Sequence, residues 1–179
     1  METYTDFKEP EENSSYYQQR QEGLRSLTDD LIDAPIVDLI NRLNHLPYCF
    51  TLQCCYGHFV YGHQTDIHNF EPLPADDSIA EVTYRIAYLA FCIENSIPGR
   101  DMLDRLIAVT GIDAGYVQFG CADWFWERQV NSYVLQVEPD RCKYQDTAIL
   151  DLHEARYVEK IRDLFFNQLR ELLEKMINR

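Results

Sequence analysis

The longest regular pattern of hydrophobic residues lies at the C-terminal end of the chain, from Leu152 to Arg179. Within it, apolar side chains recur at spacings of three and four residues: Val158, Ile161, Phe165, Leu169, Leu172 and Met176. This spacing predicts one long amphipathic helix that lays its apolar stripe on a core. We expect its last three turns to project far enough to pair with a second copy of the chain, as a homodimer.

Two shorter helices are predicted by the same period and by the residues at their ends. Between Pro35 and Pro47, four apolar side chains fall on one helical face: Ile36, Leu39, Ile40 and Leu43. A further helix is expected to begin at Ile97-Pro98-Gly99 and to close at Gly111, because proline favours the first turn and glycine the position after the last.

Four segments have the composition of β-strands. Residues 48–61 carry no charged side chain and are rich in aromatic and β-branched residues, which is typical of a buried strand. Residues 80–95, 115–126 and 131–139 are interpreted as three more strands, separated from one another by a helix and a polar turn. We expect a bulge at Gly57, a turn at Gly62, a long surface loop over 62–80 and a polar connection over 140–150. This order predicts an α+β fold, with a mixed or antiparallel sheet of four to six strands and helices on one face.

Composition and charge narrow the classes of protein. Residues 1–22 are polar and acidic and are predicted to form a mobile tail, which leaves 23–179 as a single domain. The net charge of −14 disfavours extended binding to nucleic acid. No apolar run approaches the roughly 18 residues of a membrane span, and the N-terminus lacks the pattern of a secretory signal. With six cysteines and no export signal, we expect reduced thiols and a cytoplasmic protein.

Soft metal ligands are concentrated in one short stretch: Cys54, Cys55, His58, His63 and His68. Imidazole and thiolate groups suit zinc or another transition metal, although the spacing matches no zinc-finger pattern. On a regular strand Cys54 and His58 share one face, so Cys55 and His58 converge only across a bulge. The alternative is that the cysteines fill a core and the histidines lie on a neutral loop. A third interpretation makes Cys54 or Cys55 a nucleophile with His58 as its base.

Both tryptophans of the chain fall in CADWFWER, residues 121–128. Trp124 and Trp126 could form a stacking wall for a planar ligand, with charged neighbours as anchors. The alternative is that they pack at the end of a buried strand.

The stretch IVDLINRLNHLPYCFTLQCCYGHF resembles the opening block of the wybutosine-synthesis methyltransferases, a family that modifies a tRNA. Ile40 and Asn41 precede the strand, and Cys55, Gly57 and His58 fall at the family's cysteine, glycine and arginine. SYVLQVEP is similar to a later strand of that family, so the resemblance covers residues 36–165 in outline. Gln53 and Cys54 stand where the family has two serines, and the family's Gly-Phe-Arg-Asn-Ser-Gly block is absent.

The resemblance implies the family's fold and a pocket for S-adenosylmethionine beside the first strand. Cys55 and His58 would be its catalytic residues and Thr51 would line it. Gly57 would allow close approach of the backbone, and Tyr56 or Trp126 would stack on the ligand. Three hypotheses of function follow: a methyltransferase-like protein that binds a small molecule, a metal-binding or metal-sensing module, and a non-enzymatic homo-oligomeric adaptor.

Overall fold

The computed structural model describes residues 6–75 and 79–177. In these ranges the helices and strands follow in the order α1 (Tyr16–Ser26), α2 (Val37–His45), β1 (Cys49–Cys55), β2 (His58–Tyr61), β3 (Val82–Arg85), β4 (Ala87–Ile93), α3 (Ile97–Ala108), β5 (Val117–Gly120), α4 (Asp123–Arg128), β6 (Ser132–Val137), β7 (Thr147–Leu150) and α5 (Leu152–Ile177). Short 3-10 turns occupy Asp29–Leu31, Ala34–Ile36, Val109–Ile112 and Asp140–Cys142. No helix in the described ranges is both long and apolar enough to cross a bilayer.

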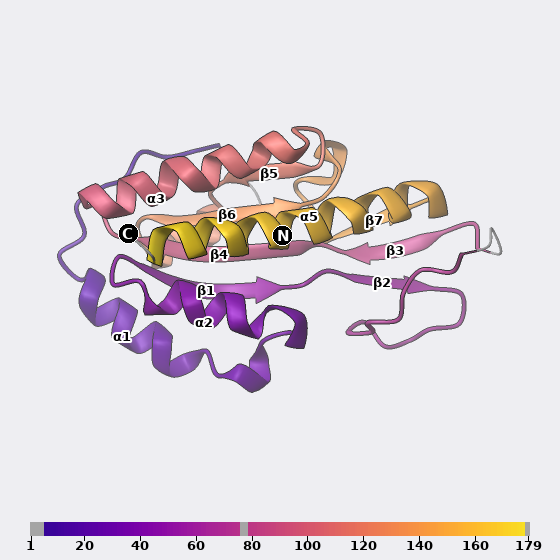
Figure 1. Cartoon of the computed structure of the whole chain (residues 1–179), viewed down its shortest axis with the longest axis horizontal. Coiled ribbons are helices and arrows are strands. Elements are labelled where there is room, and N and C mark those ends of the chain that lie inside the picture. The colour runs from indigo at the N-terminus through magenta and orange to yellow at the C-terminus, as the bar shows by residue number, and fades with distance from the viewer. Residues whose placement is uncertain (1–5, 76–78, 178–179) are drawn as a thin grey trace.

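The strands form two antiparallel sheets that lie end to end. The larger has the order β1-β4-β6-β5 and the smaller the order β2-β3-β7. The chain passes from one sheet to the other within a few residues, from β1 to β2 and from β3 to β4, so Figure 1 shows them as one long twisted ribbon of strands. Residues 138–146 make an excursion between β6 and β7. The predicted α+β class, with an antiparallel sheet and a long C-terminal helix, is confirmed.

Helices α2, α3 and α5 cover the face of the sheets that is turned toward the viewer in Figure 1. Alternate residues of β4 and β6 point into this layer, among them Leu89 and Leu135, and are fully buried. The predicted stripe of α5 packs on them, with Val158, Phe165 and Leu169 at 1% exposure or less. Burial of large apolar side chains at this density, at about 1.5–3 kcal/mol each, is the main force that holds the helical layer in place.

The end of α5 packs against its own domain. Leu173 is buried, and Arg170 donates hydrogen bonds to the Pro35 carbonyl and to Asp38 in the first turn of α2. The prediction that the last three turns project away from the domain is therefore wrong, because their apolar side is used within the chain. Exposed Leu164 and Ile177 remain on the outer surface of this helix. A homodimer through α5 stays a prediction.

The described part of the expected N-terminal tail, residues 6–22, contacts the domain, whereas residues 1–5 lie outside the described ranges. Phe7 stacks on Tyr133 at 5.9 Å between ring centroids, and Lys8 forms an ion pair with Asp123. Tyr16 opens α1 and is buried against Phe50, on the sheet face opposite the large helical layer. Aromatic packing explains why this acidic segment is held in place.

Two strand predictions are corrected. The segment expected to continue as a strand through Trp126 turns into helix α4 after Gly120. Residues two apart share one face of a strand but lie on nearly opposite sides of a helix, so the two tryptophans diverge. The polar connection expected over 140–150 contains β7, whose buried Ala148 and Leu150 alternate with exposed neighbours.

Candidate functional site

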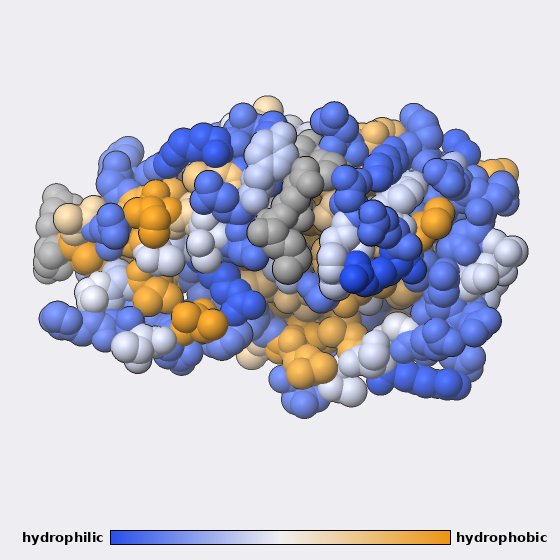
Figure 2. Space-filling model, turned by 180° about the vertical axis from the view of Figure 1, so that it is seen from behind, coloured by the Kyte–Doolittle hydropathy of each residue, from blue (hydrophilic) through white to orange (hydrophobic). Residues whose placement is uncertain are grey.

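A cavity of about 450 Å³ lies on the sheet face opposite α2, α3 and α5, where the two sheets meet. Tyr88, Trp124 and Phe125 form its aromatic wall. Further lining comes from Val60 and Thr83 of the smaller sheet and from Ile67 of the long loop. Figure 2 shows this side of the molecule, with apolar side chains exposed between hydrophilic ones toward the end that holds the smaller sheet.

The polar groups of the cavity come from four places in the chain: Gln53, Arg85, Gln136 and Asp146. Gln136 is fully buried, and its amide nitrogen donates to Glu138. Among the described residues, its carbonyl oxygen has no hydrogen-bond partner. A buried acceptor without a partner costs about 1–3 kcal/mol. Gln136 is a lining residue, so a donor of a bound molecule that reaches this oxygen would offset that cost.

Glu138 lies behind Gln136 and is also fully buried. Burial, reinforced by the negative charge of Asp146, raises the pKa of the Glu138 carboxyl to about 9, although the hydrogen bond from Gln136 opposes the shift. Glu138 is therefore protonated at neutral pH. Its Oε2 atom has no partner within the described part of the chain. A neutral carboxyl group thus lies next to Gln136, which itself lines the cavity.

Of the residues that the sequence suggested for ligand binding, Trp124 lines the cavity. Trp126 instead packs edge-on against Tyr133, with the Lys8 ammonium 5.3 Å from its ring. Thr51 is buried within β1, where its backbone N–H donates to Asn44 at 2.8 Å.

Tyr56 and Gly57 contact α5 rather than the cavity. The Tyr56 ring stacks on Phe166 at 5.1 Å, and its hydroxyl donates to Asp163. Arg162 lies 4.3 Å from the same ring and donates to the Gly57 carbonyl at 3.1 Å. The tyrosine that was expected to stack on a ligand thus packs against one helix through Phe166 and Arg162.

Gly57 permits the break between β1 and β2. Its φ of +91° favours glycine, and a Cβ atom there would lie 2.8 Å from the Cβ of Ala87. The bulge predicted at Gly57 is therefore a break between strands of two different sheets, and the register shift of β1 lies earlier, between Thr51 and Gln53.

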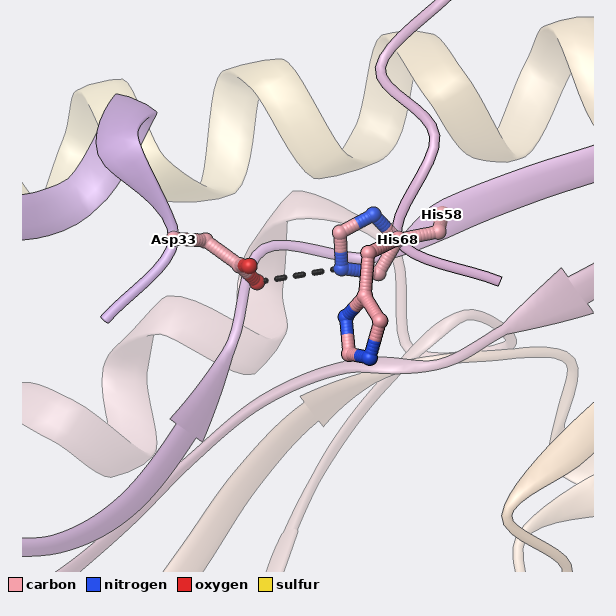
Figure 3. Close-up of side chains that lie close together, drawn as sticks. All are labelled: Asp33, His58 and His68. Carbon is pink, nitrogen blue, oxygen red and sulfur yellow. Dashed lines mark hydrogen bonds and ion pairs between the residues drawn. The ribbon is translucent and has the colours of Figure 1, made fainter. Parts of the chain in front are cut away.

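His58 is the centre of a second, separate group of side chains, which joins it to Asp33 and His68 (Figure 3). Its Nε2 lies 3.1 Å from Asp33 Oδ2, and its Nδ1 lies 3.2 Å from the Asn69 carbonyl oxygen. Burial lowers the pKa of His58, but the hydrogen bonds to Asp33 and Cys55 outweigh it and raise the pKa to about 10. Burial raises the pKa of Asp33, but the hydrogen bond and the charge of His58 outweigh burial and lower it. His58 and Asp33 therefore form an ion pair.

This arrangement bears on the proposed thiol chemistry. Both ring nitrogens of His58 face acceptors, so the protonated ring has no lone pair with which to accept a proton from Cys55. Burial, and next the charge of Asp33, raise the pKa of the Cys54 thiol to about 12. Neither the protonated His58 ring nor the raised pKa of Cys54 activates a cysteine as a nucleophile.

The five ligands suggested by sequence do not form one group within the described residues. His58 and His68 meet, and Asp33 takes the third position. Cys54, Cys55 and His63 lie outside the set whose ligand atoms fall within 4.8 Å of one another. Asp33 was missed because nothing in its local sequence marks it. Gln136 and Glu138 had a signal, since they share one strand face with Ser132 in SYVLQVEP, while the opposite face is apolar.

No family model matches the chain, and no curated protein matches its sequence. Among solved structures, the chain is similar to the PH1069 protein from Pyrococcus horikoshii, in one structure with 15% identity and a TM-score of 0.51. A second structure, of PH1069 from strain OT3, gives 14% identity and a TM-score of 0.50. Each alignment covers 92% of this chain and 94% of the other. At this identity the likeness concerns the fold alone.

Proposed function

We propose that the protein binds a small molecule with a planar ring and a cationic group in the cavity between the two sheets, and that S-adenosylmethionine is this molecule. The observation that carries the proposal is that Gln136, whose buried side-chain oxygen has no hydrogen-bond partner among the described residues, belongs to the lining of a cavity with an aromatic wall. Methyl transfer is the reaction that the resemblance to wybutosine-synthesis methyltransferases implies.

The cavity supports this proposal by its size and its lining. About 450 Å³ falls in the range of sites that enclose small ligands, which are mostly apolar with few polar groups. Tyr88, Trp124 and Phe125 offer aromatic surface to a planar ring. Asp146 offers a carboxylate to a cation, and Arg85 offers a guanidinium to a carboxylate.

S-adenosylmethionine carries a partner for each of these groups. Its adenine ring suits the aromatic wall, and its exocyclic amine can donate to Gln136. Its positively charged groups suit Asp146, and its carboxylate suits Arg85. When bound, it would supply a methyl group on a positively charged sulfur. The protein's own part is to orient the molecule through these contacts and to exclude water with the aromatic wall.

Titration calorimetry with S-adenosylmethionine tests the proposal directly, with ATP as the comparison. ATP has the same adenine ring, but its triphosphate is repelled by Asp146, so we expect heat from S-adenosylmethionine alone. If millimolar S-adenosylmethionine gives no heat, the proposal is wrong.

The two tryptophans supply a matched pair of variants that locates the ligand. Trp126→Phe leaves Trp124 as the single tryptophan, and Trp124→Phe leaves Trp126. We expect S-adenosylmethionine to change the emission of the Trp126→Phe variant and to leave that of the Trp124→Phe variant unchanged. Equal responses from both variants would place the ligand elsewhere.

A further inference from the structure

Asp33, His58 and His68 come from three separate segments and lie on the border of the long loop that follows β2. Asp33 lies in the turn before α2, His58 begins β2, and His68 lies within the loop. Figure 3 shows the His68 ring beside the ion pair, with one ring nitrogen turned toward Asp33. His58 is buried and His68 is exposed, so the group has a closed side and an open side.

The spacing of these side chains is close to that of a metal site. In a tetrahedral zinc site with bonds near 2.1 Å, neighbouring ligand atoms are about 3.4 Å apart. The His58 and Asp33 ligand atoms are 3.1 Å apart, and all three ligand atoms lie within 4.8 Å of one another. A shift of at most about 1.4 Å in His68, on the exposed loop, brings the third ligand into range.

Neighbouring groups fix the orientation of two of the three side chains, as the outer partners of metal ligands do. The Nδ1–H of His58 donates to the Asn69 carbonyl, which fixes the ring and points Nε2 at the site. The backbone N–H of Tyr56 donates to Asp33 Oδ2 at 2.7 Å, which fixes the carboxylate. Phe70 packs on the His58 ring with centroids 4.9 Å apart. Two ligands are therefore held in place by contacts that an ion would not disturb.

We propose that Asp33, His58 and His68 bind a divalent transition metal ion, with zinc as the representative, and that the ion fixes the loop over residues 62–75 to the domain. The donor set of two imidazoles and one carboxylate suits zinc and leaves a fourth position open on the exposed side. On binding, the ion replaces the proton on Nε2 of His58, which now lies between this nitrogen and Asp33 Oδ2. Ile67, next to His68, lines the cavity, so the ion also fixes one wall of the cavity.

Titration of the reduced, tag-free, full-length protein with zinc chloride tests the site. We expect one ion per chain, and we expect His68→Asn to weaken binding by more than about tenfold, because losing a ligand costs at least as much as losing an outer partner. His63→Asn is the matched control, since His63 lies on the same loop, is exposed and stands outside the group. Its affinity should equal that of the unchanged chain.

A second measurement separates an ion in this site from one held elsewhere. Hydrogen exchange of residues 62–75 should slow when zinc is added to the unchanged chain and to the His63→Asn variant, and should stay the same in the His68→Asn variant. Less than a tenth of an equivalent of bound zinc, or an affinity for zinc that is unchanged in His68→Asn, overturns the proposal. The test needs no cavity ligand, so its failure leaves the proposed function standing.

Discussion

The buried carboxyl of Glu138 should make the stability of this protein fall as the pH rises. Burial and the charge of Asp146 disfavour ionisation and raise the pKa of this carboxyl from its ordinary 4.5 to about 9 in the folded state. Below pH 4.5 the carboxyl is protonated whether the chain is folded or not, so it has no effect there. Between pH 4.5 and 9 the unfolded chain loses the proton while the folded chain keeps it, which favours unfolding by up to about 1.4 kcal/mol per pH unit.

Glu138→Gln removes this titration and keeps the shape of the protonated side chain. Between pH 4.5 and pH 7 this effect on the free energy of unfolding adds up to at most about 3 kcal/mol. At pH 7 the variant should therefore be more stable than the unchanged chain by up to that amount. The difference should shrink toward zero as the pH falls to 5. Urea unfolding followed by circular dichroism at pH 5, 6, 7 and 8 measures it.

Glu154→Gln is the control with the opposite sign. The hydrogen bond and charge of Arg141 lower the pKa of Glu154, so this carboxylate stabilises the fold above its unfolded pKa and loses that effect as the pH falls. Its replacement should therefore destabilise the chain at pH 7 and less so in acid. A Glu138→Gln effect that is constant from pH 5 to 8, or one that destabilises at pH 8, would refute the reasoning.

Three further predictions concern packing. Gly57→Ala should lower the free energy of unfolding by roughly 2–4 kcal/mol in urea titrations, because it strains a positive φ and meets Ala87; an unchanged midpoint would show that the break between β1 and β2 adapts. Arg162→Met should cost about 1–3 kcal/mol, since it leaves the Gly57 carbonyl unpaired inside the protein, and a neutral effect would point to replacement by water. Phe7→Ala should speed proteolysis within residues 6–14 because the ring no longer packs on Tyr133, and an unchanged cleavage rate would contradict this account.

The elements that the sequence predicts well are those whose own periodicity determines their burial. Helix α5 buries Val158, Phe165 and Leu169, as the spacing of three and four residues requires. The helix after Ser96 begins as expected, with the Ser96 hydroxyl accepting from the Gly99 N–H and proline in the first turn. The tryptophan segment was mistaken for a strand because three consecutive aromatic residues have neither the strand period nor the helix period. Its conformation depends on what each ring finds to pack against.

The candidate metal group of Asp33, His58 and His68 could not be predicted from local sequence patterns. The sequence draws attention to His63 and His68, which are neighbours along the chain, yet the partner of His58 is Asp33, which comes 25 residues earlier. That contact depends on two backbone features: the turn before α2, and the positive φ of Gly57, which ends β1 and reorients His58. On an uninterrupted strand His58 would share a face with Cys54. The backbone conformation of Gly57 therefore determines which residues contact His58, and the residue types alone do not predict these contacts.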